Sequence, residues 1–169
     1  MAVIDENTRN FLQSLTNKVI DNWTLFEELL TSKKIKKNEH FFQHFEPCED
    51  VAIVNSGLFR LYLVNREGEE KTYSFIPEKS FILDFFLTNA EEGPRKAMIS
   101  AQALEDSEIY TIKYSKLIEA LNSDAIFQEI YRAALLRNYL LKTKDKNHEH
   151  SICISRTRKS VCGNGQRII

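Results

Sequence analysis

The segment from Phe81 to Ala97 carries the residue types best suited to bind an anion. An apolar stretch runs into Asp84, and the loop that follows ends with Arg95 and Lys96. This pattern predicts a strand end, a short helical turn and a loop into the next strand. Backbone N–H groups at a helix start and neighbouring cations both attract phosphate-like groups. The segment therefore predicts an anion pocket, with an ordinary charged surface loop as the alternative.

A second candidate site is a pair of histidines, His40 and His44, which share one face of an expected strand with Phe42 between them. A zinc site needs at least three protein ligands, and no third one follows in a recognisable pattern. The sequence also lacks the motifs of serine hydrolases, zinc proteases, phosphate-binding loops and dinucleotide folds. We therefore expect no catalytic residue and no metal; the alternative is a cupin-like metal-dependent enzyme that uses both histidines.

The stretch from 33 to 114, which contains these candidates, has the pattern of short strands. Turn signals such as those at 55–57 and 105–107 recur about every 8–12 residues, a spacing typical of an all-β sandwich or barrel. Residues 97–103 alternate, with three alanines and Ile99 on one face. Small residues on an inner face leave room inside a barrel for a ligand, or simply for a bulky neighbour.

Apolar spacing predicts helices on both sides of these strands. In the first 32 residues we expect two short amphipathic helices, over 11–20 and over 23–30. After the strands, Ser115 is expected to cap a short helix that ends at Leu121. Residues 122–124 are expected to cap a longer helix that starts at residue 125 and ends near residue 146.

The helix expected over 125–146 is apolar nearly all round, so it should be buried on more than one face. One face can cover the strands, and the most economical partner for the other is the same helix of a second copy. We therefore predict a homodimer. The expected interface residues are Ile130, Ala133, Leu136, Arg137 and Leu140.

The charged residues are distributed unevenly between the first 141 residues and the C-terminal tail. Residues 1–141 carry a net charge of −6 and residues 142–169 a net charge of +5, within a total of −1. This balance excludes a chain that binds nucleic acid by overall charge. The three cysteines are widely spaced, and no apolar run approaches the roughly 20 residues that span a bilayer. We expect a soluble cytoplasmic protein without membrane contact and with a disordered tail over 151–169.

Four stretches in series resemble the cyclic-nucleotide-binding β-roll of the Crp/Fnr transcription regulators, and most closely their Bacteroidetes-type branch. They are VNSGLFRLY (54–62), NREGEEKT (65–72), FIPE (75–78) and ALEDSEIY (103–110). The resemblance covers about residues 5–155. It implies a mainly β fold with flanking helices (α+β), in which a β-roll (double-stranded β-helix or jelly roll) over 33–114 follows N-terminal helices over 1–32. C-terminal helices over 115–150, which include the dimerisation helix, complete it.

The resemblance also implies a non-enzymatic sensor that binds an effector and passes a signal to a DNA-binding helix-turn-helix domain. The ligand contacts that it implies are Asp84, Arg95, Lys96, Ala97 and Phe75. Leu83 and Asp84 stand where the family has Gly-Glu, so we expect cyclic AMP to bind weakly or not at all.

No cofactor is expected, and any effector is an unidentified small molecule. The tail cannot build a recognition helix, so we expect this chain to lack its own DNA-reading domain and to contact DNA only through such a domain. The alternative function is a free-standing small-anion or cyclic-nucleotide binding protein.

Overall fold

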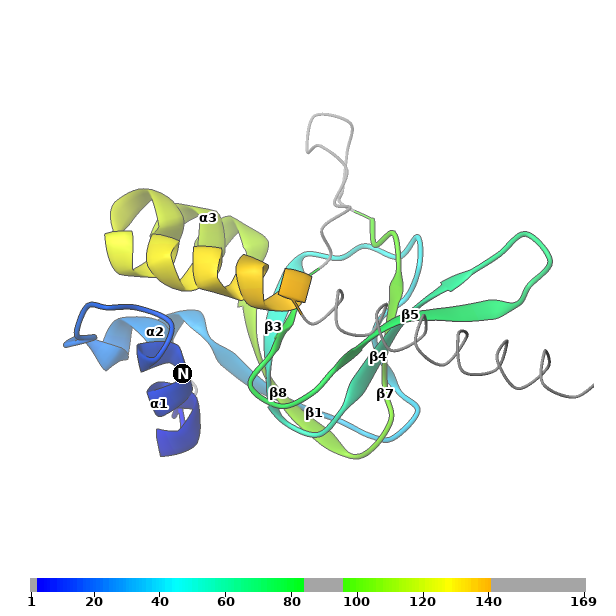
Figure 1. Ribbon diagram of the computed structural model, residues 1–169, viewed down its shortest axis with the longest axis horizontal. Coiled ribbons are helices and arrows are strands. Elements are labelled where there is room, and N and C mark those ends of the chain that lie inside the picture. The colour runs from blue at the N-terminus through cyan, green and yellow to red at the C-terminus, as the bar shows by residue number, and fades with distance from the viewer. Residues whose placement is uncertain (1–2, 84–95, 141–169) are drawn as a thin grey trace, which may run out of the picture.

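A computed structural model describes residues 3–83 and 96–140, and its centre is a pair of antiparallel four-stranded sheets (Figure 1). Sheet A has the strand order β1-β8-β3-β6, and sheet B has the order β2-β7-β4-β5. The strands are β1 (Thr31–Ile35), β2 (His40–Phe42), β3 (Asp50–Ser56), β4 (Phe59–Val64), β5 (Glu70–Ile76), β6 (Phe81–Ile82), β7 (Ser100–Ala103) and β8 (Ser107–Lys113). Neighbours such as β1 and β8 are far apart in sequence, as in a jelly roll, so the predicted β-roll is confirmed.

Large side chains fill the interior between the two sheets by lying opposite small ones. The inner face predicted for residues 97–103 is buried throughout. In the register of sheet B, Phe59 lies opposite Ala103, and Phe42 lies opposite Ala101. The alanines therefore make room for bulky neighbours of the same chain, which was the second of the two interpretations that the alternation allowed.

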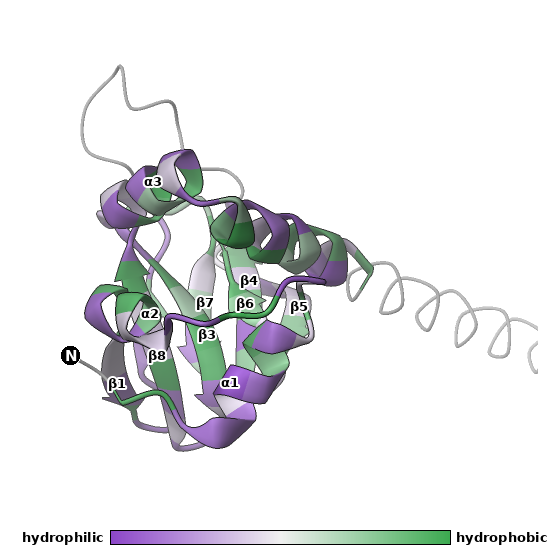
Figure 2. Cartoon of the chain, turned by 90° about the vertical axis from the view of Figure 1, so that its left-hand side faces the viewer, coloured by the Kyte–Doolittle hydropathy of each residue, from purple (hydrophilic) through white to green (hydrophobic). Residues whose placement is uncertain are grey.

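The outer face of sheet A is apolar as well, and helices cover it. In β3, Val51 and Ile53 belong to the cluster under the helices, whereas Ala52 and Val54 belong to the β-roll interior. A strand buried on both faces needs such a continuous apolar run. Figure 2 shows the helices lying across the apolar strands of sheet A. They are α1 (Glu6–Gln13), α2 (Trp23–Leu29), α3 (Tyr114–Ser123) and a helix over residues 125–140, called helix 125–140 below.

The first helix occupies different residues from those predicted. It begins early because the Asp5 carboxylate caps it by accepting the backbone N–H of Thr8 at 3.0 Å. The predicted helix over 11–20 was wrong after Gln13, whose side-chain oxygen instead accepts the backbone N–H of Ile20 at 3.0 Å. This bond holds the chain in a loop up to the start of α2, which lies within its predicted range.

The C-terminal helices agree with the prediction in number and differ in their caps. The prediction that Ser115 caps the first was wrong, because α3 already begins at Tyr114, directly after β8, and ends at Ser123 rather than Leu121. The cap predicted within 122–124 is confirmed, since Asp124 Oδ1 accepts the backbone N–H of Ile126 at 2.7 Å. The expected continuation to residue 146 and the tail over 151–169 lie outside the described residues.

Gly57, in the turn between β3 and β4, is a position where a larger side chain should destabilise the fold. It has a φ of +100° and packs against Ser107. A Cβ atom there would lie 2.1 Å from Ser107 Oγ and 2.9 Å from its Cα. Gly68 is the matched control: its φ is +85°, and a Cβ atom would meet open space. We expect Gly68→Ala to cost about 1 kcal/mol of unfolding free energy, and Gly57→Ala to cost at least twice as much in urea denaturation. Equal losses would contradict the close packing at Gly57.

Candidate functional site

The structure describes the predicted anion segment at its two ends, residues 81–83 and 96–97. Leu83 is buried, and Lys96 is exposed and forms an isolated antiparallel bridge with Pro47. The next residue, Ala97, is held by a backbone bond from its N–H to Glu46 O at 2.9 Å. The structure therefore describes both ends of the segment, while Asp84 and Arg95 lie outside the described residues.

The described members of the predicted ligand set do not share one pocket. Ala97 is fully buried in the β-roll interior. Phe75 is 49% exposed on β5, opposite Arg60, on the outer face of sheet B. Lys96 is a surface residue. Of these three residues, only Lys96 is placed where it could meet an anion.

The outer face of sheet B carries a polar network that sequence reasoning missed. Arg60 Nε donates to Gln102 Oε1 at 2.8 Å, Arg60 Nη2 pairs with Glu70 Oε2 at 2.5 Å, and the guanidinium lies 4.4 Å above the Tyr62 ring. The Tyr62 hydroxyl lies 2.8 Å from His40 Nε2. The sequence pattern that could have indicated this network is the polar residue at every second position of the neighbouring strands β4 and β7.

The two histidines lie apart, and only His40 belongs to this network. His40 bonds Tyr62, whereas β2 ends at Phe42, so that His44 lies beyond it and stacks on Phe45 with ring centroids 3.8 Å apart. In the part of the chain that the structure describes, no three His, Cys, Asp or Glu side chains group to hold a metal ion. The prediction that His40 and His44 share one face of a strand was wrong, because the strand ends at Phe42 and the two imidazoles contact different partners.

Helix 125–140 brings a buried polar residue to the strand that precedes the anion segment. Asn138 is 2% exposed, and its Nδ2 donates to Phe81 O in β6 at 2.9 Å. Its Oδ1 has no hydrogen-bond partner among the described residues. Sequence reasoning missed this contact, although a polar side chain one helical turn after buried Ala134 was the signal that could have shown it.

The residues predicted to form a dimer interface divide between two faces of helix 125–140. Ile130 is buried in this chain's own core, and Ala133 is half-buried. Leu136 and Leu140 are 59% and 49% exposed. Arg137 is exposed, and its guanidinium lies 5.4 Å from the ring centroid of Phe11 in α1 of the same chain.

The architecture defines a class of protein: a helix-flanked β-roll with a long helix after it, as in cyclic-nucleotide-type sensor domains. The profile of the family "Cyclic nucleotide-binding domain" matches residues 32–124, more than half of the chain. The chain therefore belongs to the cyclic nucleotide-binding domain family, and it is homologous to Crp/Fnr regulators, as predicted.

Among curated proteins, the anaerobic regulatory protein of Bacillus subtilis (strain 168) is 29% identical over 101 residues, which make up 60% of this chain and 41% of that protein. This chain thus matches less than half of the length of its relative. In the described residues, no helix has both the length and the apolar character needed to cross a membrane.

Two solved structures share the fold. The c-di-GMP responsive regulator CLP of Xanthomonas campestris aligns with a TM-score of 0.63 and 15% identity, covering 86% of this chain and 73% of that chain. The sensor domain of the regulator DNR from Pseudomonas aeruginosa aligns with a TM-score of 0.58 and 18% identity, covering 77% and 91%. At these identities the likeness establishes the fold alone.

The bond from Asn138 to Phe81 can be tested by truncation. Asn138→Ala leaves a buried carbonyl without its donor, so we expect it to lower the unfolding free energy by about 1–3 kcal/mol. The control is Asn10→Ala on the exposed side of α1, with an expected change within about 0.5 kcal/mol. Urea denaturation followed by circular dichroism measures both. An unchanged midpoint for Asn138→Ala would show that helix 125–140 does not depend on this bond.

Proposed function

We propose that the chain is the effector-sensing domain of a Crp/Fnr-type transcription regulator, that it works as a homodimer through helix 125–140, and that it regulates rather than catalyses. The observation that carries this proposal is an exposed apolar stripe on that helix, formed by Leu136, Tyr139 and Leu140, which are 59%, 63% and 49% exposed. Their spacing of three and four residues places them on one face. We assign DNA reading to a part of the regulator outside residues 3–140, and its place of action to the cytoplasm.

The two faces of helix 125–140 support this role. Phe127, Ile130, Ala134 and Asn138 are buried against the rest of the chain, and the exposed apolar stripe lies on another face. Exposed apolar side chains grouped on one helix favour contact with a partner. A second copy fits, because two-fold symmetry brings the same stripe onto itself. Ile130 faces the chain's own core, so the proposed interface consists of the stripe together with Ala133 and Arg137.

The effector site that we propose is the mouth of the β-roll, between Leu83 and Lys96. Lys96 supplies a cation there, and the sequence adds Arg95 and Asp84. Arginine binds planar anions through two parallel hydrogen bonds, and lysine acts as a point charge. The site therefore suits a small anion whose binding is passed to helix 125–140.

The dimer proposal predicts the effect of charging the stripe. In Leu136→Lys/Leu140→Lys, two ammonium groups would have to be buried without partners, which is costly. We expect the wild-type chain to sediment as a dimer at micromolar concentration and this variant as a folded monomer, because both leucines are exposed in the single chain. Val19→Lys, at a residue that is 70% exposed elsewhere, is the control and should remain dimeric. A wild-type monomer at tens of micromolar would overturn the proposal.

The proposed effector site also leads to a prediction about cyclic AMP. Leu83 replaces the glycine that lets the family's backbone approach phosphate, and the shorter Asp84 replaces the glutamate that holds the ribose hydroxyl. A ligand at 100 times its dissociation constant stabilises by about 2.7 kcal/mol, which a melting curve resolves easily. We expect no rise in melting temperature with millimolar cyclic AMP. A clear rise at sub-millimolar concentration, lost in Arg95→Ala, would instead support a cyclic-nucleotide binding protein.

A further inference from the structure

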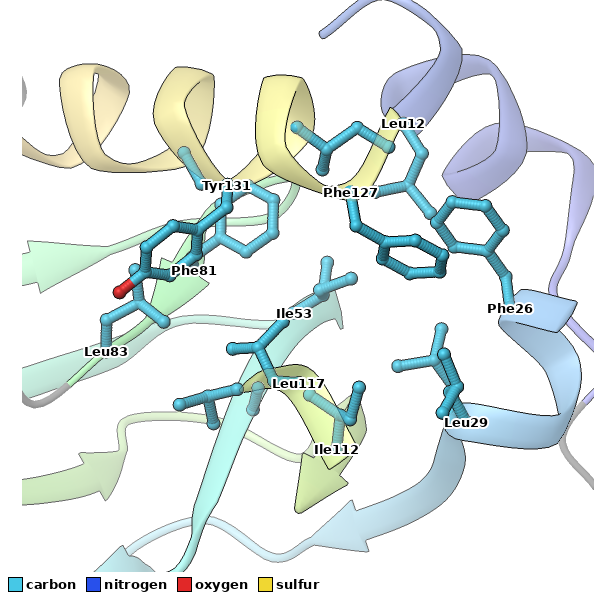
Figure 3. A pocket seen from close by; sticks show the side chains of 15 residues that line it. Leu12, Phe26, Leu29, Ile53, Phe81, Leu83, Ile112, Leu117, Phe127 and Tyr131 are labelled. Atoms are coloured by element: carbon cyan, nitrogen blue, oxygen red, sulfur yellow. The ribbon is translucent and has the colours of Figure 1, made fainter. Parts of the chain in front are cut away.

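An apolar cavity lies between the outer face of sheet A and the helices (Figure 3). Its volume is about 60 Å³, and its lining surface is apolar throughout. Side chains from sheet A and from the helices meet around it: Ile53 from β3, Phe81 from β6, Leu12 from α1, Phe26 from α2 and Phe127 from helix 125–140. The cavity thus lies on the opposite face of sheet A from the β-roll interior, and Phe81 and Leu83, at the start of the anion segment, belong to its lining.

The lining determines which occupant the cavity can take. Protein interiors are close-packed, and voids larger than a water molecule are few. A buried water needs two to four polar partners, and an apolar cavity offers none, so such cavities stay dry. The occupant that fits is therefore an apolar molecule.

The volume limits the size of that occupant. An engineered apolar cavity of about 150 Å³ holds benzene or xenon, and the cavity described here is less than half as large. One of its walls is formed by a small residue, Ala134 in helix 125–140, which is 1% exposed. Enlarging this side chain would therefore fill the space directly.

We propose that this cavity is a binding site for a small apolar molecule of a few heavy atoms, such as a dissolved gas or a short hydrocarbon. Its occupant would contact sheet A and helix 125–140 together. Among the described residues, the side-chain hydrogen bond from Asn138 to Phe81 O joins this helix to sheet A, whereas Glu129 contacts Thr16 and Lys18 in the loop between α1 and α2. Filling the cavity therefore tightens helix 125–140 against the sheet. An effect of this tightening on the dimer rests on the function proposed above.

Xenon is the probe for the site. In methyl-labelled protein under xenon pressure, we expect saturable shifts for the methyl groups of Ile53, Ile112 and Ile130, which line the cavity. The methyl groups of Ile76 and Ile99, in the β-roll interior, should not shift. Amide exchange in residues 127–134 should slow. Shifts confined to other methyl groups, or none at all, would overturn the proposal, as would benzene binding as tightly as xenon.

Variants that fill the cavity make the test specific. Ala134→Met should abolish the xenon shifts, whereas Ala125→Met, at an exposed position of the same helix outside both the lining and the proposed interface, should keep them. If Ala134→Met does not fold, Val51→Ile adds one methyl group to the lining and should weaken the shifts. Xenon shifts that persist in a folded filled variant would refute the site.

Sedimentation of the same samples separates this site from the dimer. Xenon shifts in a monomeric protein would retain the cavity as a site and reject the proposed dimer. A dimer without xenon shifts would retain the dimer and reject the site.

Discussion

The structure depends on one constraint: sheet A is apolar on both of its faces, so both must be covered. Sheet B covers the inner face. The outer face, around Val51, Ile53 and Ile112, can be covered only by the helices, and burial of each such side chain contributes about 1.5–3 kcal/mol. The N-terminal helices and helix 125–140 are joined over it by the stacked rings of Phe26 and Phe127, whose centroids are 4.4 Å apart. The positions of the candidate sites follow from this packing.

A small number of polar contacts determines how the helices lie on that apolar face. Apolar packing alone is non-directional. Tyr110 in β8 donates its hydroxyl to Asp5 Oδ2 at 3.0 Å at the start of α1. Burial raises the pKa of Asp5, but the hydrogen bonds from Thr8 and Tyr110 outweigh it and hold that pKa below its usual value, while burial raises the pKa of Tyr110. Near neutral pH the pair therefore remains a carboxylate and a phenol. The bond from Asn138 to Phe81 O orients the other end of the helical layer.

Helix 125–140 connects these features to the proposed function. One face is packed on sheet A, ends at Asn138 beside the strand that enters the anion segment, and borders the apolar cavity. Another face presents the exposed apolar stripe. A rigid helix moves as a unit, so a change under the first face alters the position of the second. A sensor of this construction needs a two-state contact between helix and sheet rather than a continuous path of bonds.

The sequence by itself determined the β-roll, the helices on both sides of it and the family, because period-two patterning, turn residues and four consecutive motifs are local signals. It also indicated the inner face of residues 97–103. The tertiary structure decided the rest. Whether His40 meets His44 or Tyr62 depends on where β2 ends, and whether Ile130 faces a partner or the core depends on how the helix is rotated against sheet A. The buried bond of Asn138 and the apolar cavity form where segments distant in sequence meet. A local pattern can mark Asn138 as a polar residue on an apolar helix face, but it cannot identify Phe81 as its partner or reveal the cavity.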